Sequence, residues 1–334
     1  MKRAPVTLLL VAVIGLVALG AEAQAPVKVV FALNWFAVGD HAAYWVAVDR
    51  GYYKARGLEV ELQNSKGSGD SIAKVDSGRA DIGLADAVVV IPRVAQGAKV
   101  KVVGAVFDLT PLNIWTRKDT GIVKPKDLEG KLLAAPAGDA QRQLFPAFAK
   151  LNGVDESKVK WLSIEPAAKF VALSEKRADA VPDYTTGQPF WEKAVGKENL
   201  VRMPWSQFGF DTYSMSIMAS EKTINERAKV LRDFLAASYM GWRDVMQDPK
   251  ASLEIFKKRV PDIDLALIEP NMMLGLELMK TDRYAKNGLG WMERAKMCRT
   301  VEVINSYMPD MPRKVGCDEV FTNEFLTKIE PPRP

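Results

Sequence analysis

The sequence predicts an α/β fold of two lobes, each a mainly parallel sheet flanked by helices, with a ligand cleft between them. The first supporting observation is residues 27–62, where an apolar run of strand length, a helix-like segment and a second strand follow one another. The second is an internal echo, because residues 77–83 and 175–181 both pass from a helical segment through Arg-Ala-Asp into an aliphatic strand. Both copies share the order strand, polar loop, helix, strand, so two lobes of similar plan are the simplest interpretation.

The N-terminal residues predict export. Lys2 and Arg3 precede an uncharged run, 6–19, which is followed by the A-x-A pattern Ala21-Glu22-Ala23. The run is too short to span a membrane comfortably, so an uncleaved anchor or a core helix is the lesser alternative. We therefore expect a signal peptide, 1–23, cleaved before Gln24, and a periplasmic mature protein.

Polar and aromatic residues gather where the first strand, 27–33, ends. Asn34 and Trp35 close this strand, and open α/β sheets bind ligands at the carboxyl ends of their strands. Trp35 is expected to stack on a flat ligand, with core packing as the alternative, and Asn34 offers both donors and acceptors. His41 is interpreted as a ligand contact or a cap residue, and Tyr44, one turn later, is expected to face the same way.

The helix after this loop has predicted ends, since Asp40 is expected to cap it and Gly51 to end it in a left-handed turn. The loop 67–71 opens a second helix, where Ser68 and Asp70 are candidate ligand residues, although Asp70 is alternatively a helix cap. Asp86 follows the strand 81–84. Its carboxylate is suited to accept from an exocyclic amine or a cationic ligand.

The second lobe repeats these features. Gly138 and Asp139 lie at a helix start directly after the strand 131–135, without the Gly-Lys-Ser/Thr ending of a P-loop. Asp183 and Tyr184 follow the strand 178–181, as Asp86 follows its own. All four are candidate ligand residues.

Two breaks in strand-like sequence predict the crossings between lobes, and the second contains Trp205 and Phe208, which are expected to pack the hinge. The predicted boundaries are 26–110 plus 214–330 for lobe one and 111–213 for lobe two, with the helical segment 223–308 backing lobe one.

Composition excludes several classes of function. The net charge is +5 without a Lys/Arg run, which argues against nucleic acid as a partner. A single His gives little basis for a nitrogen/sulfur metal site, and we expect no metal and no cofactor. Cys298 and Cys317 are close in sequence, and an oxidising compartment permits a disulfide between them, with two separate buried thiols as the alternative.

Three stretches, 34–62, 78–86 and 128–139, resemble the NMT1/THI5-like family of periplasmic solute-binding proteins. The most specific of them reads Asn34-Trp35, then His41, then Gly51-Tyr52-Tyr53. Members of this family are receptors of ABC importers for thiamin pyrimidine precursors, sulfonates and nitrate. The resemblance implies a type II-like binding-protein fold, a small-molecule ligand, and a permease and ATPase at the inner membrane as partners. We expect a monomer.

Enzymes are the rival class. The fungal enzyme that synthesises hydroxymethylpyrimidine phosphate shares the opening motif, but its pyridoxal-binding lysine and reacting histidine align here with Ala85 and Val89. Its cysteine-rich iron motif corresponds to residues 208–213, which contain no cysteine, and no Gly-x-Ser-x-Gly elbow of a hydrolase occurs. We therefore expect no catalytic residues. Trp35 and the carboxylates favour an aminopyrimidine-like ligand, whereas a sulfonate, nitrate or aromatic acid would need a cation such as Arg142.

Overall fold

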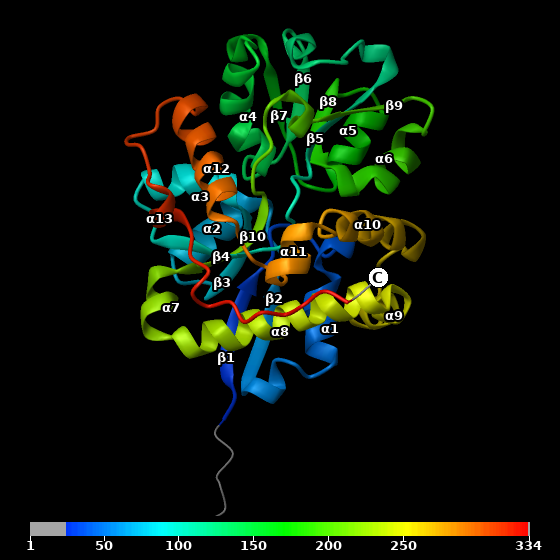
Figure 1. Cartoon of the computed structure of the whole chain (residues 1–334). Coiled ribbons are helices and arrows are strands. Elements are labelled where there is room, and N and C mark those ends of the chain that lie inside the picture. Colours follow the sequence, from blue (N-terminus) through cyan, green and yellow to red (C-terminus); the bar gives the residue numbers. More distant parts are fainter. Residues whose placement is uncertain (1–24, 333–334) are drawn as a thin grey trace, which may run out of the picture.

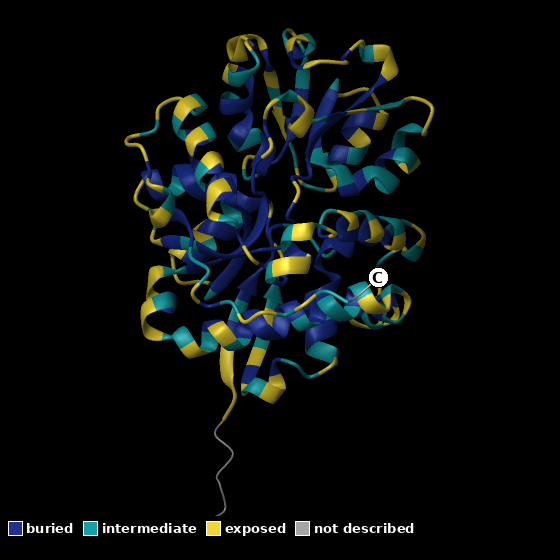
Figure 2. Cartoon of the chain, in the orientation of Figure 1, coloured by how far each residue is buried: buried dark blue, intermediate teal, exposed yellow. Residues whose placement is uncertain are grey.

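The computed structural model describes residues 25–332 and contains two five-stranded sheets flanked by helices, as predicted (Figure 1). The predicted signal peptide lies outside the described residues. Within residues 25–332, no helix combines the length and apolar character needed to cross a membrane. Figure 2 shows that the inner strands of both sheets are buried, whereas most exposed residues lie on helices, loops and the edge strands.

The first sheet has the strand order β2-β1-β3-β10-β4, and we call this sheet with its helices lobe one. Strands β1, β2 and β3 run parallel, whereas β10 is antiparallel to both β3 and β4, so the sheet is mixed. Strand β10 comes from a later part of the chain than the other four. The strands are β1 (Val27–Ala32), β2 (Leu58–Gln63), β3 (Ile82–Asp86), β4 (Val100–Ala105) and β10 (Met215–Ser220).

The second sheet, which we call lobe two with its helices, follows the same plan in the order β7-β6-β8-β5-β9. Strand β6 is parallel to β7 and β8, and β5 is antiparallel to β8 and β9. The chain crosses between lobes after β4 and again after β9; the exact lobe boundaries stay a prediction. The strands are β5 (Leu112–Arg117), β6 (Leu132–Ala135), β7 (Lys160–Ser163), β8 (Ala180–Tyr184) and β9 (Leu200–Pro204).

The echoed Arg-Ala-Asp segments make the same contact in both lobes. The Asp81 carboxylate accepts from the backbone N–H of Val30 in β1 at 2.8 Å, and Asp179 accepts from Leu132 in β6, also at 2.8 Å. Each aspartate thus ties the start of its own strand to the neighbouring parallel strand. The echo in the sequence is therefore a repeated structural device.

Helices cover both sheets, and the C-terminal ones pack chiefly on lobe one. Helices α8 and α9 lie against α1, whereas α12 packs on α3 of lobe one and also on α4 of lobe two. The longer helices outside the cleft are α1 (Ala42–Asp49), α3 (Ala87–Ala95), α8 (Ala228–Gln247), α9 (Pro249–Arg259) and α12 (Arg294–Tyr307). Those that border the cleft are α2 (Ser68–Asp76), α4 (Ala140–Leu151), α5 (Ala168–Ser174), α6 (Gln188–Val195) and α10 (Leu265–Glu277). The short helices are α7 (Glu221–Glu226), α11 (Asp282–Asn287) and α13 (Cys317–Val320).

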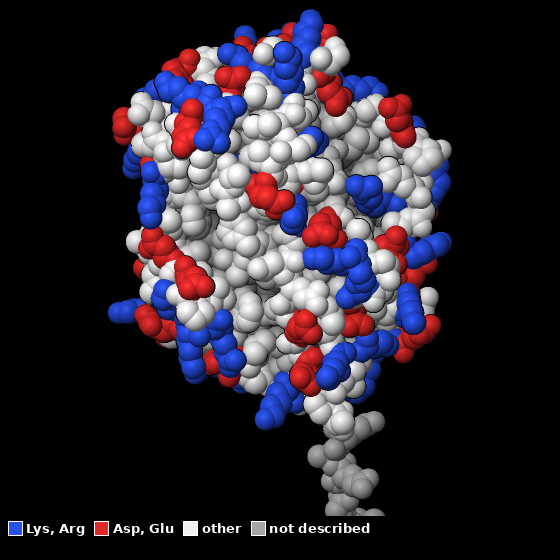
Figure 3. Space-filling model, turned by 180° about the vertical axis from the view of Figure 1, so that it is seen from behind, with Lys and Arg blue, Asp and Glu red and all other residues white. Residues whose placement is uncertain are grey.

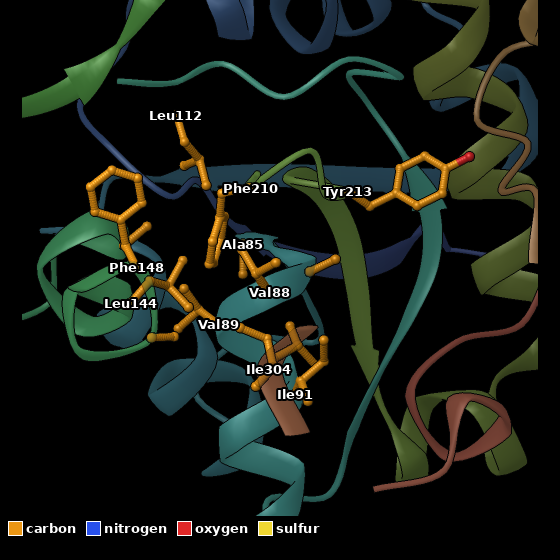
Figure 4. Packing of buried hydrophobic residues seen from close by; sticks show 14 of the residues in the cluster. Ala85, Val88, Val89, Ile91, Leu112, Leu144, Phe148, Phe210, Tyr213 and Ile304 are labelled. Atoms are coloured by element: carbon orange, nitrogen blue, oxygen red, sulfur yellow. The ribbon is translucent and has the colours of Figure 1, made fainter. Parts of the chain in front are cut away.

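One apolar cluster joins the two lobes behind the cleft. Val88 and Val89 of α3, Leu144 and Phe148 of α4, and Ile304 of α12 belong to it (Figure 4). At the second crossing the buried Trp205 ring stacks on Phe148, with centroids 4.2 Å apart. Trp205 therefore packs the hinge region, as predicted.

The two cysteines are joined in a disulfide between α12 and α13. The Cα atoms of Cys298 and Cys317 are 5.1 Å apart, within the ordinary range for such a bond. The alternative of two separate thiols does not describe this arrangement.

Two predicted helix ends had different outcomes. Gly51 has φ +73°, a left-handed conformation that glycine adopts without a Cβ clash, so that prediction is confirmed. The prediction for Asp40 is wrong, because Gly39–His41 forms a short 3-10 turn, η1, and no side-chain cap bond is made there. The Asp40 carboxylate bonds across the cleft instead, as described below.

Candidate functional site

A cavity lies between the carboxyl ends of the strands in the two lobes. It encloses about 630 Å³, its open mouth included. The strand ends β1, β3 and β8 supply part of its wall, and the starts of α2 and α4 supply another part, because in open α/β sheets these ends meet at one edge. Eight of the candidate ligand residues line it: Asn34, Trp35, His41, Ser68, Asp86, Asp139, Asp183 and Tyr184.

Three candidate residues lie outside this lining. Tyr44 is fully buried in the core of lobe one, where its ring packs edge-on against Phe31 at 4.9 Å. Because the turn before it is 3-10 and not α-helical, Tyr44 does not share the direction of His41. Asp70 accepts from the Lys66 backbone N–H at 3.0 Å, outside the cavity. Gly138 lies at the rim, where its carbonyl accepts from the Gly69 N–H at 3.1 Å.

Asp86 is the central acceptor on the wall of lobe one. Its fully buried carboxylate accepts from the Ser68 hydroxyl at 2.7 Å, from the Tyr184 hydroxyl at 2.8 Å and from the Ser214 hydroxyl. Within residues 25–332 it forms no ion pair with Lys or Arg. Burial raises the pKa of Asp86, against the opposing effect of its three hydroxyl donors.

A relay of hydrogen bonds connects His41 to this carboxylate. The Val38 backbone N–H donates to Nδ1 of His41 at 3.3 Å, so the ring proton is placed on Nε2, which donates to Oδ1 of Asn34 at 2.9 Å. The Asn34 amide then donates to the Tyr184 hydroxyl at 3.3 Å, and Tyr184 donates to Asp86. Burial lowers the pKa of His41 to about 3, so the imidazole is neutral and holds the Asn34 amide in one orientation.

The wall of lobe two contains a buried cation that sequence reasoning missed. The Lys169 ammonium of α5 lies 3.1 Å from Oδ2 of Asp139, 3.8 Å from Oδ1 of Asp183, and 4.9 Å from the centroid of the Trp35 ring. The sequence does carry a signal, because Lys169 shares a helix face with Ala172 and Leu173, which are buried. A lysine on an apolar helix face indicates a buried ion pair.

Two further carboxylates differ in how they are held. Oδ2 of Asp183 accepts from the Trp191 indole N–H at 2.8 Å, and burial raises the pKa of Asp183. Oδ2 of Asp40 accepts from the Thr186 hydroxyl of lobe two at 2.7 Å, and its other oxygen has no hydrogen-bond partner among the described residues. Burial raises the pKa of Asp40 to about 7. Sequence reasoning treated Asp40 as a cap and missed its place in the cavity.

Aromatic side chains complete the wall. Trp35, Phe170 and Phe190 line the cavity, and Trp35 is only partly buried. Arg142, the cation suggested for an anionic ligand, turns away, since it donates to the Ala135 carbonyl at 2.7 Å and lies over the Trp161 ring. The arrangement can therefore stack a flat ring and accept hydrogen bonds from its edge.

The chain is similar to known binding proteins over most of its length. It is 24% identical over 308 residues, 90% of this chain and 86% of the relative, to the riboflavin-binding protein RibY of Chloroflexus aurantiacus. It is 22% identical to the formylaminopyrimidine-binding protein of Halalkalibacterium halodurans, with 71% of this chain and 72% of that protein covered. The 4-amino-5-hydroxymethyl-2-methylpyrimidine phosphate synthase of Schizosaccharomyces pombe is 32% identical, but over 31% of this chain and 30% of the enzyme.

Solved structures show the same fold. The alkanesulfonate-binding protein SsuA of Xanthomonas axonopodis pv. citri aligns with a TM-score of 0.65 at 13% identity, over 91% of this chain and 99% of that one. The nitrate-binding protein NrtA of Synechocystis PCC 6803 aligns with a TM-score of 0.64 at 12% identity, over 90% and 87%. The two-lobed architecture is thus that of periplasmic binding proteins. Together with the family model described as NMT1/THI5 like, which matches residues 38–252, the fold shows that this chain belongs to the NMT1/THI5-like family.

Proposed function

We propose that this protein is the periplasmic substrate-binding component of an ABC importer and that it captures a flat nitrogen heterocycle by closing its two lobes. The observation that carries the proposal is the pairing in one cavity of a partly exposed Trp35 ring with the buried carboxylate of Asp86. A ring stacked on Trp35 buries apolar area, and an amine at its edge donates to Asp86. The proposed place of action is the periplasm, reached through the signal peptide 1–23.

The names of the relatives support a heterocyclic ligand. The two relatives that align over most of the chain are named for riboflavin and formylaminopyrimidine, both flat nitrogen heterocycles. An aminopyrimidine related to thiamin precursors remains the preferred ligand. The synthases match between 31% and 41% of the chain, and the positions expected for their lysine and histidine are Ala85 and Val89, both fully buried and apolar. Binding without catalysis is therefore the function that we propose.

Anionic ligands fit the cavity less well. Four carboxylates line it, and Lys169, the cation beside them, is already paired with Asp139. A sulfonate, nitrate or aromatic acid would meet repulsion from these carboxylates without a free cation to offset it. A heterocycle that donates hydrogen bonds meets acceptors instead.

The mechanism is lobe closure, in which contacts from both walls favour the closed state that a permease recognises. Polar contacts already cross the cleft in this structure, among them Tyr184 to Asp86 and Thr186 to Asp40. The described conformation is therefore a closed one. We expect small-angle scattering to show that the mature protein contracts when its ligand is added, from an ensemble that includes open forms.

The test begins with a thermal-shift screen of the mature protein against pyrimidines, flavins, sulfonates, nitrate and aromatic acids. For the best compound, Trp35→Ala should weaken binding by about 1–3 kcal/mol, or roughly five- to a hundredfold, because stacking and burial are lost. Calorimetry measures the change. The matched control is Trp291→Ala, since Trp291 is 37% exposed and lies outside the cavity lining. A folded Trp35→Ala protein with wild-type affinity would place the site elsewhere.

A further inference from the structure

The cavity has an excess of negative charge, although the net charge of the sequence is +5. On the face shown in Figure 3, Lys and Arg are interspersed with Asp and Glu over the whole outline. In the cavity, four carboxylates belong to Asp40, Asp86, Asp139 and Asp183. The ion pairs of residues 25–332 give these four one cation, Lys169, which lies within 4 Å of Asp139 and Asp183.

The remaining carboxylates have no charged partner. Asp86 is surrounded by the hydroxyls of Ser68, Ser214 and Tyr184, and the Asp139 carboxylate contributes to raising its pKa, after burial. The single imidazole, His41, is neutral and acts on Asp86 only through Asn34 and Tyr184.

Asp40 is in a similar position. It faces the Thr186 hydroxyl, Gly275 of α10 and, more distantly, the Asp183 carboxylate. It is 4% exposed, and one of its oxygens has no hydrogen-bond partner among the described residues. The described residues therefore give neither Asp40 nor Asp86 a cation, although hydroxyl groups donate hydrogen bonds to both.

Uncompensated buried carboxylates are costly, and two things relieve the cost: a proton on the acid or a cation beside it. Burial raises the pKa of Asp40 to about 7, so this acid holds a proton below that pH in the empty protein, and burial raises the pKa of Asp86 and of Asp183 as well. A ligand that supplies a positive charge replaces the proton on Asp40. A neutral ligand leaves this proton in place, and an anion favours it further.

We propose that the ligand is a planar cation, such as an amidinium, a pyridinium or a protonated aminopyrimidine, whose charge lies beside the carboxyl groups of Asp40 and Asp86, which have no Lys or Arg partner among the described residues. This inference rests on the proposed function and narrows its substrate class from any hydrogen-bond-donating heterocycle to a charged one. Trp35 is consistent with a cation, because the face of an indole ring attracts positive charge and this ring is only partly buried in the cavity lining.

Three probes of similar shape, one cationic, one neutral and one anionic, test which ligand charge the cavity prefers. Benzamidine is a planar cation, benzamide its neutral counterpart and benzoate its anionic counterpart. Binding is measured by ligand-observed NMR and by displacement of the best compound from the screen. Benzamidine should bind at least tenfold more tightly than benzamide, and benzoate most weakly. Equal affinities, or a preference for benzamide or benzoate, would overturn the charge assignment while leaving the stacking site intact. Failure of all three and of every flat compound would overturn the proposed function as well.

Proton release gives a second readout. Calorimetry of benzamidine in two buffers of different ionisation enthalpy should show protons leaving the protein on binding near pH 6, and affinity should fall as the pH is lowered below 7. Binding with no proton release and no pH dependence would contradict the proposal.

Charge removal completes the test. Asp86→Asn should weaken benzamidine about tenfold or more and change benzamide by less than threefold. The matched control, Glu277→Gln, removes an exposed carboxylate outside the cavity lining and should change neither. A loss that is equal for both probes in Asp86→Asn would show that Asp86 acts through its shape and hydrogen bonds, and would overturn the charge argument.

Discussion

Asp86 and Tyr184 occupy the same place in the two lobes. Each lies five residues after the aspartate of the echoed segment, since 86 − 81 = 5 and 184 − 179 = 5, and each ends its strand. The two side chains meet across the cleft, where the Tyr184 hydroxyl donates to the Asp86 carboxylate at 2.8 Å. One shared plan thus delivers an acceptor from lobe one and a donor from lobe two to the same point.

The walls around this pair differ in how they hold charge. Lobe one surrounds Asp86 with hydroxyl groups, whereas lobe two holds Asp139 and Asp183 with the ammonium of Lys169. Hydroxyl groups can reverse the direction of their hydrogen bonds, but an ammonium cannot. The wall of lobe one can therefore adapt to a ligand, whereas the wall of lobe two depends on one ion-pair network.

The largest effect on stability is expected when that ion-pair network is broken. Lys169→Met leaves the buried Asp139 and the partly buried Asp183 without their cation and should lower the free energy of unfolding by about 3–5 kcal/mol. Denaturant unfolding measures the loss. Lys193→Met, which removes an exposed lysine paired with Asp264, should change stability by no more than about 0.5 kcal/mol. Similar losses in the two variants would show that the buried pair contributes nothing special.

A pH series separates two buried groups within lobe one. The folded pKa of Asp40 is raised from 3.8 to about 7, so its contribution to stability falls as the pH rises through that window. The folded pKa of His41 is lowered from 6.5 to about 3, so its contribution falls as the pH drops below 6.5. Relative to the wild type, Asp40→Asn should gain stability from pH 4 to 7, and His41→Gln should gain it from pH 6 to 4.

Each slope in this series is at most about 1.4 kcal/mol per pH unit, the value for one proton. Denaturant unfolding at several pH values gives the differences between variant and wild type. Slopes of the same sign in the two variants would contradict the assignment of Asp40 as protonated and His41 as neutral. Glu277→Gln, which removes an exposed carboxylate outside the cavity lining, is the control for a general charge effect.

Tyr184→Phe tests the contact between the equivalent positions. The change keeps the ring but removes the donor to Asp86 and the acceptor for Asn34, and it should cost about 1–3 kcal/mol of stability. In the ligand-free protein it should also shift the scattering curve toward more open forms. An unchanged curve together with unchanged stability would show that the Tyr184–Asp86 bond does not hold the lobes together.

The smallest effect is expected from a substitution at Gly138, on the rim of the cavity. A Cβ on Gly138 would lie 3.1 Å from the Lys66 carbonyl of lobe one, a tight contact that exists only while the lobes are closed. Gly138→Ala should leave unfolding nearly unchanged but weaken ligand binding by about 1 kcal/mol, because closure must push the rims apart. The control is Gly153→Ala on the same lobe, where no atom lies within 4 Å of the added Cβ. Because φ is +65° there, this variant should lose some stability but should bind ligand as the wild type does. Full wild-type affinity in Gly138→Ala would argue against close contact at this rim.

Much of the fold could be predicted from the sequence because its signals are local. Alternating and apolar runs marked the strands, and the echo marked two lobes of one plan, since each echoed aspartate makes a contact to its own sheet. Asp86, Asp183 and Tyr184 were found because they follow buried strands, and the carboxyl ends of such strands meet at one edge.

The missed parts of the site depend on partners that are distant in the sequence. From the sequence, Asp40 resembles a helix cap, and only the fold shows that its carboxylate accepts a hydrogen bond from Thr186 of the other lobe. Asn271 of α10 reaches the same point and donates to the Thr186 carbonyl at 2.8 Å, although nothing in its helix announces a site. Lys169 has one local signal, the apolar helix face that it shares with Ala172 and Leu173, but its partners Asp139 and Trp35 are distant in the sequence. Burial of a charge is a tertiary property, and local patterns indicate it without naming the partner.

If the chain is exported as proposed, the disulfide between α12 and α13 determines when the protein gains its full stability. Cytosolic thiols are kept reduced, so Cys298 and Cys317 of an exported chain would join only after it has left that compartment. Closing a loop with a sequence separation of 19 contributes roughly 3 kcal/mol in the chain-entropy model. Because α12 packs on both lobes, this increment reaches the whole molecule. The chain would thus be least resistant to unfolding while it awaits translocation and would reach its full stability only at its destination.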